Sequence, residues 1–213
     1  MAKATQVPTR TFEYCSLQYL NQWITRDSTY CIVLSRGTED EKLSMLHDAA
    51  VFYRISRNLP RSADVGKGLP RYKPLIDVLD SIKLAAFEAD PIQGIREAES
   101  AISDMYDGRG VLSLTTKVLW LKLKSPIIIY DRQARNAIGT KDGDLEGYYA
   151  EWAKAFSHYS EQIAGACTKL VTMSKYTADE ELATANYIKN VSTKAWFHER
   201  VFDIYLWNKG YGI

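Results

Sequence analysis

Paired metal ligands and a disulfide pattern are missing from this sequence. Its 213 residues contain three cysteines and three histidines, with no CxxC pair and no two histidines four residues apart. Disulfide frameworks, cysteine zinc sites and helical histidine sites all depend on such spacings. We therefore expect no metal ion, and we interpret Cys15, Cys31 and Cys167 as buried free thiols.

Long apolar runs and glycine-rich phosphate loops are also absent. No run approaches the ~20 apolar residues that a membrane-spanning helix needs, and the N-terminal residues MAKATQVPTRTFEYC lack the apolar stretch of a signal peptide. Neither GxGxxG nor GxxxxGK(S/T) occurs, which argues against nucleotide-dependent chemistry. We expect a cytoplasmic protein that does not bind membranes and needs no cofactor.

The residues that are present predict an all-α fold. With 46% hydrophobic residues, the chain can bury a core as one domain or as two small lobes. Apolar positions recur at helical spacing, and Thr38 with Glu41 forms a capping-box pattern. The strand-like run 127–130 has no partner with which to build a sheet. We predict helices at 12–24, 38–58, 70–88, 91–105, 144–172 and 194–208.

One lysine, Lys117, lies in an apolar helical run. The run belongs to TTKVLWLKLKSPIIIYDRQARNAI, residues 115–138. On a helix, Leu114 and Leu121 would flank this lysine, and burial among such side chains favours the neutral amine, which is a nucleophile. The alternative is an ordinary charge at the edge of the core whose amine reaches water.

An aspartate follows the apolar connector PIIIY in the same segment. Asp131 precedes RQARNAI, where an N-cap residue belongs, and its simplest role is to accept hydrogen bonds from the first amides of that helix. Capping would also hold the carboxylate at the end of a rigid apolar segment, a short way along the chain from Lys117. The two side chains could line one cleft or serve two separate structural roles.

The segment around these two residues resembles the active-site segment of the 8-oxoguanine DNA glycosylases with the OGG fold and their bacterial relatives, within the helix-hairpin-helix DNA glycosylase superfamily. In that pattern a Thr-Lys pair opens an apolar helix, a proline-led apolar connector follows, and an aspartate begins the next helix. Thr116 and Lys117 match the pair, and Asp131 matches the aspartate. The segment WFHERVFDIYLWNKG near the C-terminus carries a weaker resemblance.

The resemblance implies one glycosylase-like domain over residues 1–213, with two helical lobes around a cleft and the site segment at 108–138. It implies a DNA N-glycosylase that flips a modified or oxidised purine out of the duplex. Lys117 would be the Schiff-base nucleophile and Asp131 the assisting carboxylate. Strand nicking by elimination from the imine would make the enzyme bifunctional. We expect a monomer that binds double-stranded DNA.

Local basic patches would have to supply the DNA contacts, because the net charge is only +1. One patch lies at 54–73 and the other, at 109–141, surrounds the proposed site. A solvated, lysine-rich surface explains the first patch equally well. The predicted phosphate contacts are Arg109, Lys122, Lys124, Arg61, Lys67 and Arg71, and the predicted substrate contacts are Thr116, Arg132, Arg135 and the stacking residue Trp120.

The chain departs from those glycosylases just before the lysine. Their glycine-rich hairpin is replaced here by GRGVLSLTT, whose glycines, Gly108 and Gly110, lie too early to match it. That hairpin supplies backbone amides that grip DNA phosphate. Its replacement favours an alternative, a non-catalytic DNA-binding or protein-interaction module on the same helical scaffold, whereas the buried setting of Lys117 favours the enzyme.

Overall fold

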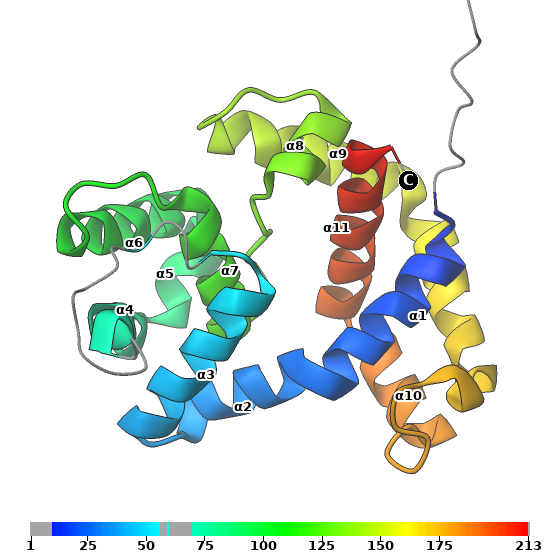
Figure 1. The fold of residues 1–213 in the computed structure, drawn as a ribbon. Helices are drawn as coiled ribbons and strands as arrows, with labels where there is room; N and C mark the ends of the chain where they lie inside the picture. Colours follow the sequence, from blue (N-terminus) through cyan, green and yellow to red (C-terminus); the bar gives the residue numbers. More distant parts are fainter. Residues whose placement is uncertain (1–9, 56–58, 60–69, 213) are drawn as a thin grey trace, which may run out of the picture. The chain divides into compact units, whose positions relative to one another are not determined.

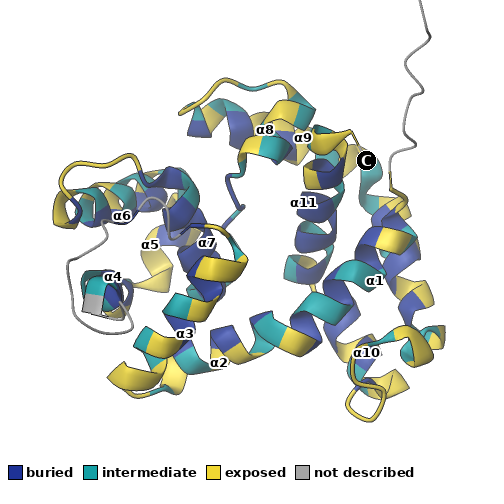
Figure 2. Ribbon diagram, in the orientation of Figure 1, coloured by how far each residue is buried: buried dark blue, intermediate teal, exposed yellow. Residues whose placement is uncertain are grey.

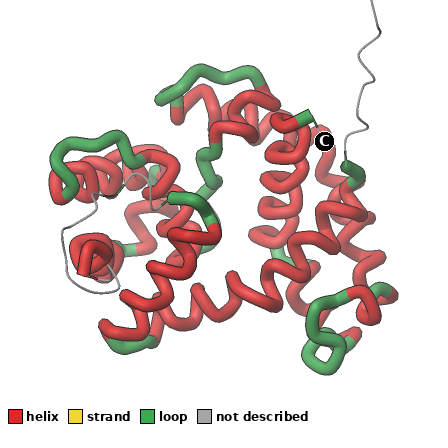
Figure 3. Tube along the Cα trace, in the orientation of Figure 1, coloured by secondary structure: helices red, strands yellow, loops and turns green. Residues whose placement is uncertain are grey.

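The computed structural model describes residues 10–55, 59 and 70–212. All regular elements in these residues are helical, and the described chain contains no strand (Figure 3), which confirms the predicted all-α class. The chain divides into two compact units, which we call the terminal unit (Met1–Thr25 and Tyr130–Ile213) and the central unit (Arg26–Ile129). The first boundary falls inside a π-helical turn, Trp23–Asp27.

The terminal unit is organised around its last helix, α11 (Ala195–Tyr211). This helix packs against α1 (Phe12–Gln22), α8 (Arg132–Ile138), α9 (Leu145–Lys169) and α10 (Ala185–Ser192). A helix with apolar residues on several sides is suited to such a central position. Figure 2 accordingly shows buried stretches along α11, with intermediate and exposed residues between them.

Aromatic rings and one glycine fix how the helices of the terminal unit pack. The ring of Phe12 on α1 lies 4.5 Å from that of Tyr205 on α11, between ring centroids. In the last turn of α11, a Cβ on Gly210 would lie 2.0 Å from the carbonyl oxygen of Gln133. Glycine therefore allows α11 and α8 to approach more closely than any side chain would permit.

The central unit surrounds α7 (Leu112–Leu123) with other helices (Figure 1). α7 packs against α2 (Ser28–Arg36), α4 (Lys73–Ser81) and α6 (Pro91–Met105), which explains why it is apolar on nearly all sides. The remaining helices of this unit are α3 (Glu39–Phe52), α5 (Leu84–Ala89) and the short 3-10 turn Pro70–Tyr72.

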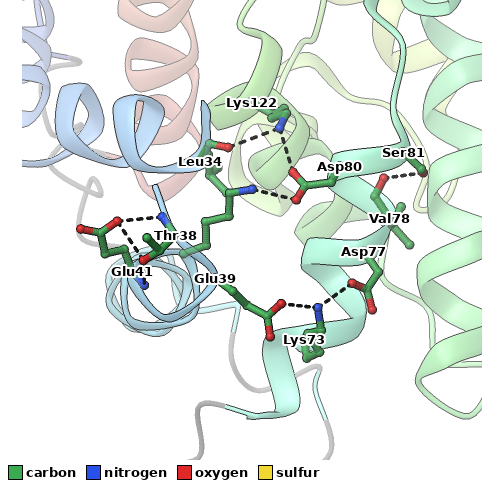
Figure 4. A network of polar contacts seen from close by, with 11 residues as sticks. Leu34, Thr38, Glu39, Glu41, Lys73, Asp77, Val78, Asp80, Ser81 and Lys122 are labelled. Atoms are coloured by element: carbon green, nitrogen blue, oxygen red, sulfur yellow. Dashed lines mark hydrogen bonds and ion pairs between the residues drawn. The ribbon is translucent and has the colours of Figure 1, made fainter. Parts of the chain in front are cut away.

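An ion network ties four helices of the central unit together (Figure 4). The carboxylate of Asp80 on α4 forms ion pairs with the amines of Lys42 on α3, at 2.7 Å, and of Lys122 on α7, at 3.1 Å. The Lys122 amine also donates a hydrogen bond of 3.3 Å to the Leu34 carbonyl of α2. The two lysines lower the pKa of Asp80, although burial of the carboxyl opposes them. The network therefore orients α7 within its unit.

The structure confirms several predicted boundaries and corrects others. α6 occupies 91–105 as predicted. The helix predicted to reach 58 ends at Phe52, since Arg54 has a φ of 56°. The helix predicted at 70–88 is interrupted at Ile82, whose extended backbone separates α4 from α5. The last helix continues past Gly210 to Tyr211, and α2 and α10 were not predicted.

No helix in the described part of the chain is both long enough and apolar enough to cross a membrane.

Candidate functional site

Lys117 is buried on α7, as its apolar neighbours predicted. Its helix neighbours Leu114, Val118 and Leu121 are fully buried, and Lys117 itself is 7% exposed. Its amine donates a hydrogen bond of 2.9 Å to the hydroxyl of Ser113, one helical turn earlier. The helix backbone thus fixes both members of this pair.

Asp131 is the N-cap residue of α8, which confirms the predicted capping role. Its carboxylate accepts a hydrogen bond of 2.9 Å from the amide of Gln133, and its side chain is half-buried. The preceding Tyr130 is buried and anchored, because its hydroxyl accepts from the amide of Gly143 at 2.7 Å. The connector therefore ends in a fixed position within the terminal unit.

A buried ion pair lies on α11 in the same unit. Arg200 and Asp203 are 3.0 Å apart, and Asp203 also accepts a hydrogen bond of 2.8 Å from the indole nitrogen of Trp152 on α9. The guanidinium of Arg200 lies 5.4 Å from the ring centroid of Tyr19 on α1. Burial raises the pKa of Asp203 to about 6, even though Arg200 and Trp152 both favour the ionised carboxylate.

Tyr148 of α9 connects this ion pair with Asp131 electrostatically. Burial raises the pKa of Tyr148 well above its ordinary value, and the charges of Asp203 and Asp131 raise it further. The buried phenol therefore stays neutral and lies in the field of both carboxylates.

Lys117 and Asp131 belong to different units of the chain, Lys117 to the central unit and Asp131 to the terminal unit. Each residue has the local setting that the sequence predicted, a buried amine on an apolar helix and a capping carboxylate. Their convergence on one site remains a prediction.

Two predicted substrate contacts are core residues. Thr116 is fully buried, and its hydroxyl donates back to the Ser113 carbonyl at 3.4 Å. Trp120 is also fully buried, so its ring has no exposed face on which a flipped base could stack. We assign both residues to the packing of α7 instead of to substrate.

The two predicted arginines of α8 have different settings. Arg132 is exposed in the first turn of the helix. The side chain of Arg135 is 13% exposed, pairs with Asp142 at 3.4 Å and donates to the Thr140 carbonyl at 3.3 Å. Arg135 therefore holds the loop after α8, and only Arg132 keeps an open position for a ligand.

The predicted phosphate contacts are similarly divided. Arg109 is exposed in the loop between α6 and α7, and Lys124 is half-buried at the end of α7. Arg71 lies over the ring of Tyr72, 4.8 Å from its centroid, and is half-buried. Lys122 is half-buried and belongs to the ion network around Asp80, and its contact with phosphate stays a prediction. Arg61 and Lys67 lie outside the described residues.

The loop between α6 and α7 stands where the glycosylases carry their glycine-rich hairpin. Gly108 has a φ of 71°, and its amide donates to the Ser103 carbonyl at 2.9 Å. Asp107, with a φ of 59°, is the first left-handed residue after α6, and Gly108 follows it with a second positive φ. This turn does not lead directly into α7, because α7 begins only at Leu112.

Sequence reasoning missed Ser113, Arg200 and Asp203. The spacing of Ser113 and Lys117 is that of neighbours on one helical face, and this signal was available in the sequence. Arg200 and Asp203 likewise stand three residues apart in an apolar helix, which is the pattern of a pair that neutralises itself.

The described residues contain no group of three or more His, Cys, Asp or Glu side chains that could hold a metal ion. Comparison of the chain with family models, with curated proteins and with solved structures finds no match.

Proposed function

We propose that this chain is a DNA N-glycosylase that removes a modified or oxidised purine from double-stranded DNA through a lysine Schiff base. The observation that carries the proposal is the setting of Lys117, an amine that is 7% exposed on an otherwise apolar helix. An amine held away from water has little hydration shell to lose when it attacks carbon. A helix-hairpin-helix glycosylase architecture, acting as a monomer, is part of the same proposal.

In the proposed reaction the neutral amine of Lys117 attacks C1′ of a flipped nucleotide. The N–C1′ bond forms while the C1′–N9 bond breaks, and the purine leaves with the bonding electrons and takes up a proton. Transfer of a proton from the attached amine to O4′ opens the sugar ring and leaves a protonated imine. Removal of a C2′ proton then expels the 3′ phosphate oxygen and nicks the strand.

Asp131 would stabilise positive charge on the sugar during this reaction. Its N-cap position fixes the orientation of the carboxylate, which electrostatic stabilisation requires. The proposal requires that Asp131 and Lys117 reach the same sugar. Asp131→Asn should therefore slow base release and imine formation, whereas Lys117→Ala should abolish the imine.

Borohydride trapping tests the proposal directly. The full chain is incubated with duplexes that each carry one oxidised or alkylated purine, borohydride is added, and covalent protein–DNA adducts are separated by denaturing electrophoresis. We expect an adduct with the wild type and none with Lys117→Ala. The matched control is Lys154→Ala, because the Lys154 side chain is 78% exposed on α9. Absence of an adduct across the whole panel, or an unchanged adduct with Lys117→Ala, would contradict the proposal.

A second candidate function is a non-catalytic DNA-binding or protein-interaction module. The burial of Trp120 and Thr116 favours it, because neither side chain can contact a flipped base from the core. The replacement of the glycine hairpin favours it as well. Duplex binding that weakens with salt, with no base release, would select a DNA-binding module. Absence of any DNA binding would select an interaction protein.

A further inference from the structure

Ser113 is the hydroxyl that the structure places on the amine of Lys117. The two residues are four positions apart on α7, which puts their side chains on one face of the helix. The Lys117 nitrogen lies 2.9 Å from the Ser113 oxygen. Helical side chains lean toward the N-terminus of their helix, so the amine naturally extends toward the turn that carries Ser113.

The surroundings make this hydrogen bond more consequential than a surface contact. Leu114, Val118 and Leu121 are fully buried, and Lys117 is 7% exposed, whereas Ser113 is only half-buried. The hydrogen bond therefore joins a buried amine to the hydroxyl of a partly exposed residue in the first turn of α7. A reactive nitrogen at that depth needs a fixed direction to meet a substrate.

A hydroxyl is suited to hold an amine through a reaction. Its oxygen accepts from an ammonium or a neutral amine, and its hydrogen can be donated to the lone pair of a neutral amine. The same contact can therefore persist when the amine loses a proton. Ser113 gains and loses no covalent bond in this role.

We propose that Ser113 is a positioning residue that directs the amine of Lys117 toward the anomeric carbon of the substrate. This inference rests on the proposed lysine chemistry and deepens it. Ser113 acts through Lys117 and does not itself touch the reacting carbon. Its removal should lower the rate of imine formation while leaving duplex affinity unchanged.

The test compares four variants of the full chain in single-turnover borohydride trapping with a duplex that the wild type processes. Ser113→Ala should trap on the order of 10- to 100-fold more slowly, the effect expected for loss of one hydrogen bond to an amine. Ser113→Thr and Ser113→Val have nearly the same shape and differ in the hydroxyl, so Thr should retain more activity than Val. The comparison of Thr with Val also holds if the alanine variant folds poorly.

Thr115→Val is the matched control on the same helix. Thr115 is fully buried, and its hydroxyl has no hydrogen-bond partner among the described residues, so its loss should leave trapping within about twofold. Duplex affinity is measured in parallel by fluorescence anisotropy.

The outcomes separate this inference from the proposed function. Wild-type trapping with unchanged rates in the alanine and valine variants at position 113 would overturn the role of Ser113 and leave the glycosylase proposal intact. Equal losses of rate and of duplex affinity would also overturn it, because they indicate a structural effect. Absence of trapping by the wild type would overturn the proposed function and this inference together.

Discussion

Replacing Asp203 with asparagine would measure how burial and ion pairing balance in the terminal unit. The Asp203 carboxyl is buried beside Arg200 and Trp152, and burial raises its pKa from 3.8 to about 6, with a further contribution from the charge of Glu199. In the unfolded chain the carboxyl ionises near its ordinary value. The folded state therefore binds this proton more tightly than the unfolded state does.

The pH dependence follows from that difference. The stability that depends on the Asp203 proton is fully present below a pH of about 3.8 and is lost as the pH rises through about 6. A shift of about two pKa units corresponds to about 3 kcal/mol in the free energy of unfolding. Between about pH 4 and pH 7, the wild type should lose about 2 to 3 kcal/mol relative to Asp203→Asn.

Urea denaturation followed by circular dichroism gives both free energies at each pH. Subtracting the variant from the wild type cancels the other titrating groups, since both proteins share them. Arg200→Met provides a second background: without the guanidinium that favours the ionised carboxylate, the effect of Asp203→Asn should become larger. If the wild type instead gains stability over the variant as the pH rises, the ion pair outweighs burial and this reasoning is wrong.

Three further predictions concern the packing of the helices and the stability cost of the candidate site, and urea denaturation measures the free energy of unfolding in each case. Thr38→Ala removes the hydroxyl that accepts from the Glu41 amide, while the residue-38 amide can still donate to the Glu41 carboxylate, and it should cost about 1 kcal/mol; no loss would mean that the cap is unimportant. Gly210→Ala would bring a Cβ to 2.0 Å from the Gln133 carbonyl oxygen and should cost about 1 to 3 kcal/mol, whereas Gly165→Ala on α9, with open space around it, should stabilise by up to about 1 kcal/mol. Equal effects at the two glycines would refute the close approach of α11 and α8. Lys117→Met removes a buried polar group while keeping an unbranched side chain. It should abolish trapping and raise the free energy of unfolding by about 0.5 to 2 kcal/mol. A marked loss of stability would indicate that the amine serves the structure of the fold.

Helix starts could be predicted because their signals are local. The Thr38 and Glu41 capping box forms as the sequence indicated, with both reciprocal hydrogen bonds. Asp90 accepts from the first amides of α6, and Asp131 does the same for α8. In each case the donor and the acceptor are two or three residues apart, so no knowledge of the tertiary fold is required.

Long-range partners could not be predicted in the same way. The sequence predicted Lys122 only as a phosphate contact, and the structure adds an acceptor, Asp80, that lies 42 residues earlier in the chain. The composition of Lys122's own segment contains no information about that partner. The division into units is equally non-local, because α1 packs with α9 and α11 from the opposite end of the sequence.

Charges within apolar helices have different explanations in the two units. On α11, Arg200 and Asp203 neutralise each other three residues apart, so a buried ion pair accounts for both without any chemistry. On α7, Ser113 stands four residues before Lys117 on the same helical face, and its hydroxyl accepts a hydrogen bond from the amine. A neutral hydroxyl orients an amine without neutralising it. The spacing of polar residues on a buried helix therefore indicates contact in both units, between two charges on α11 and between an amine and a hydroxyl on α7.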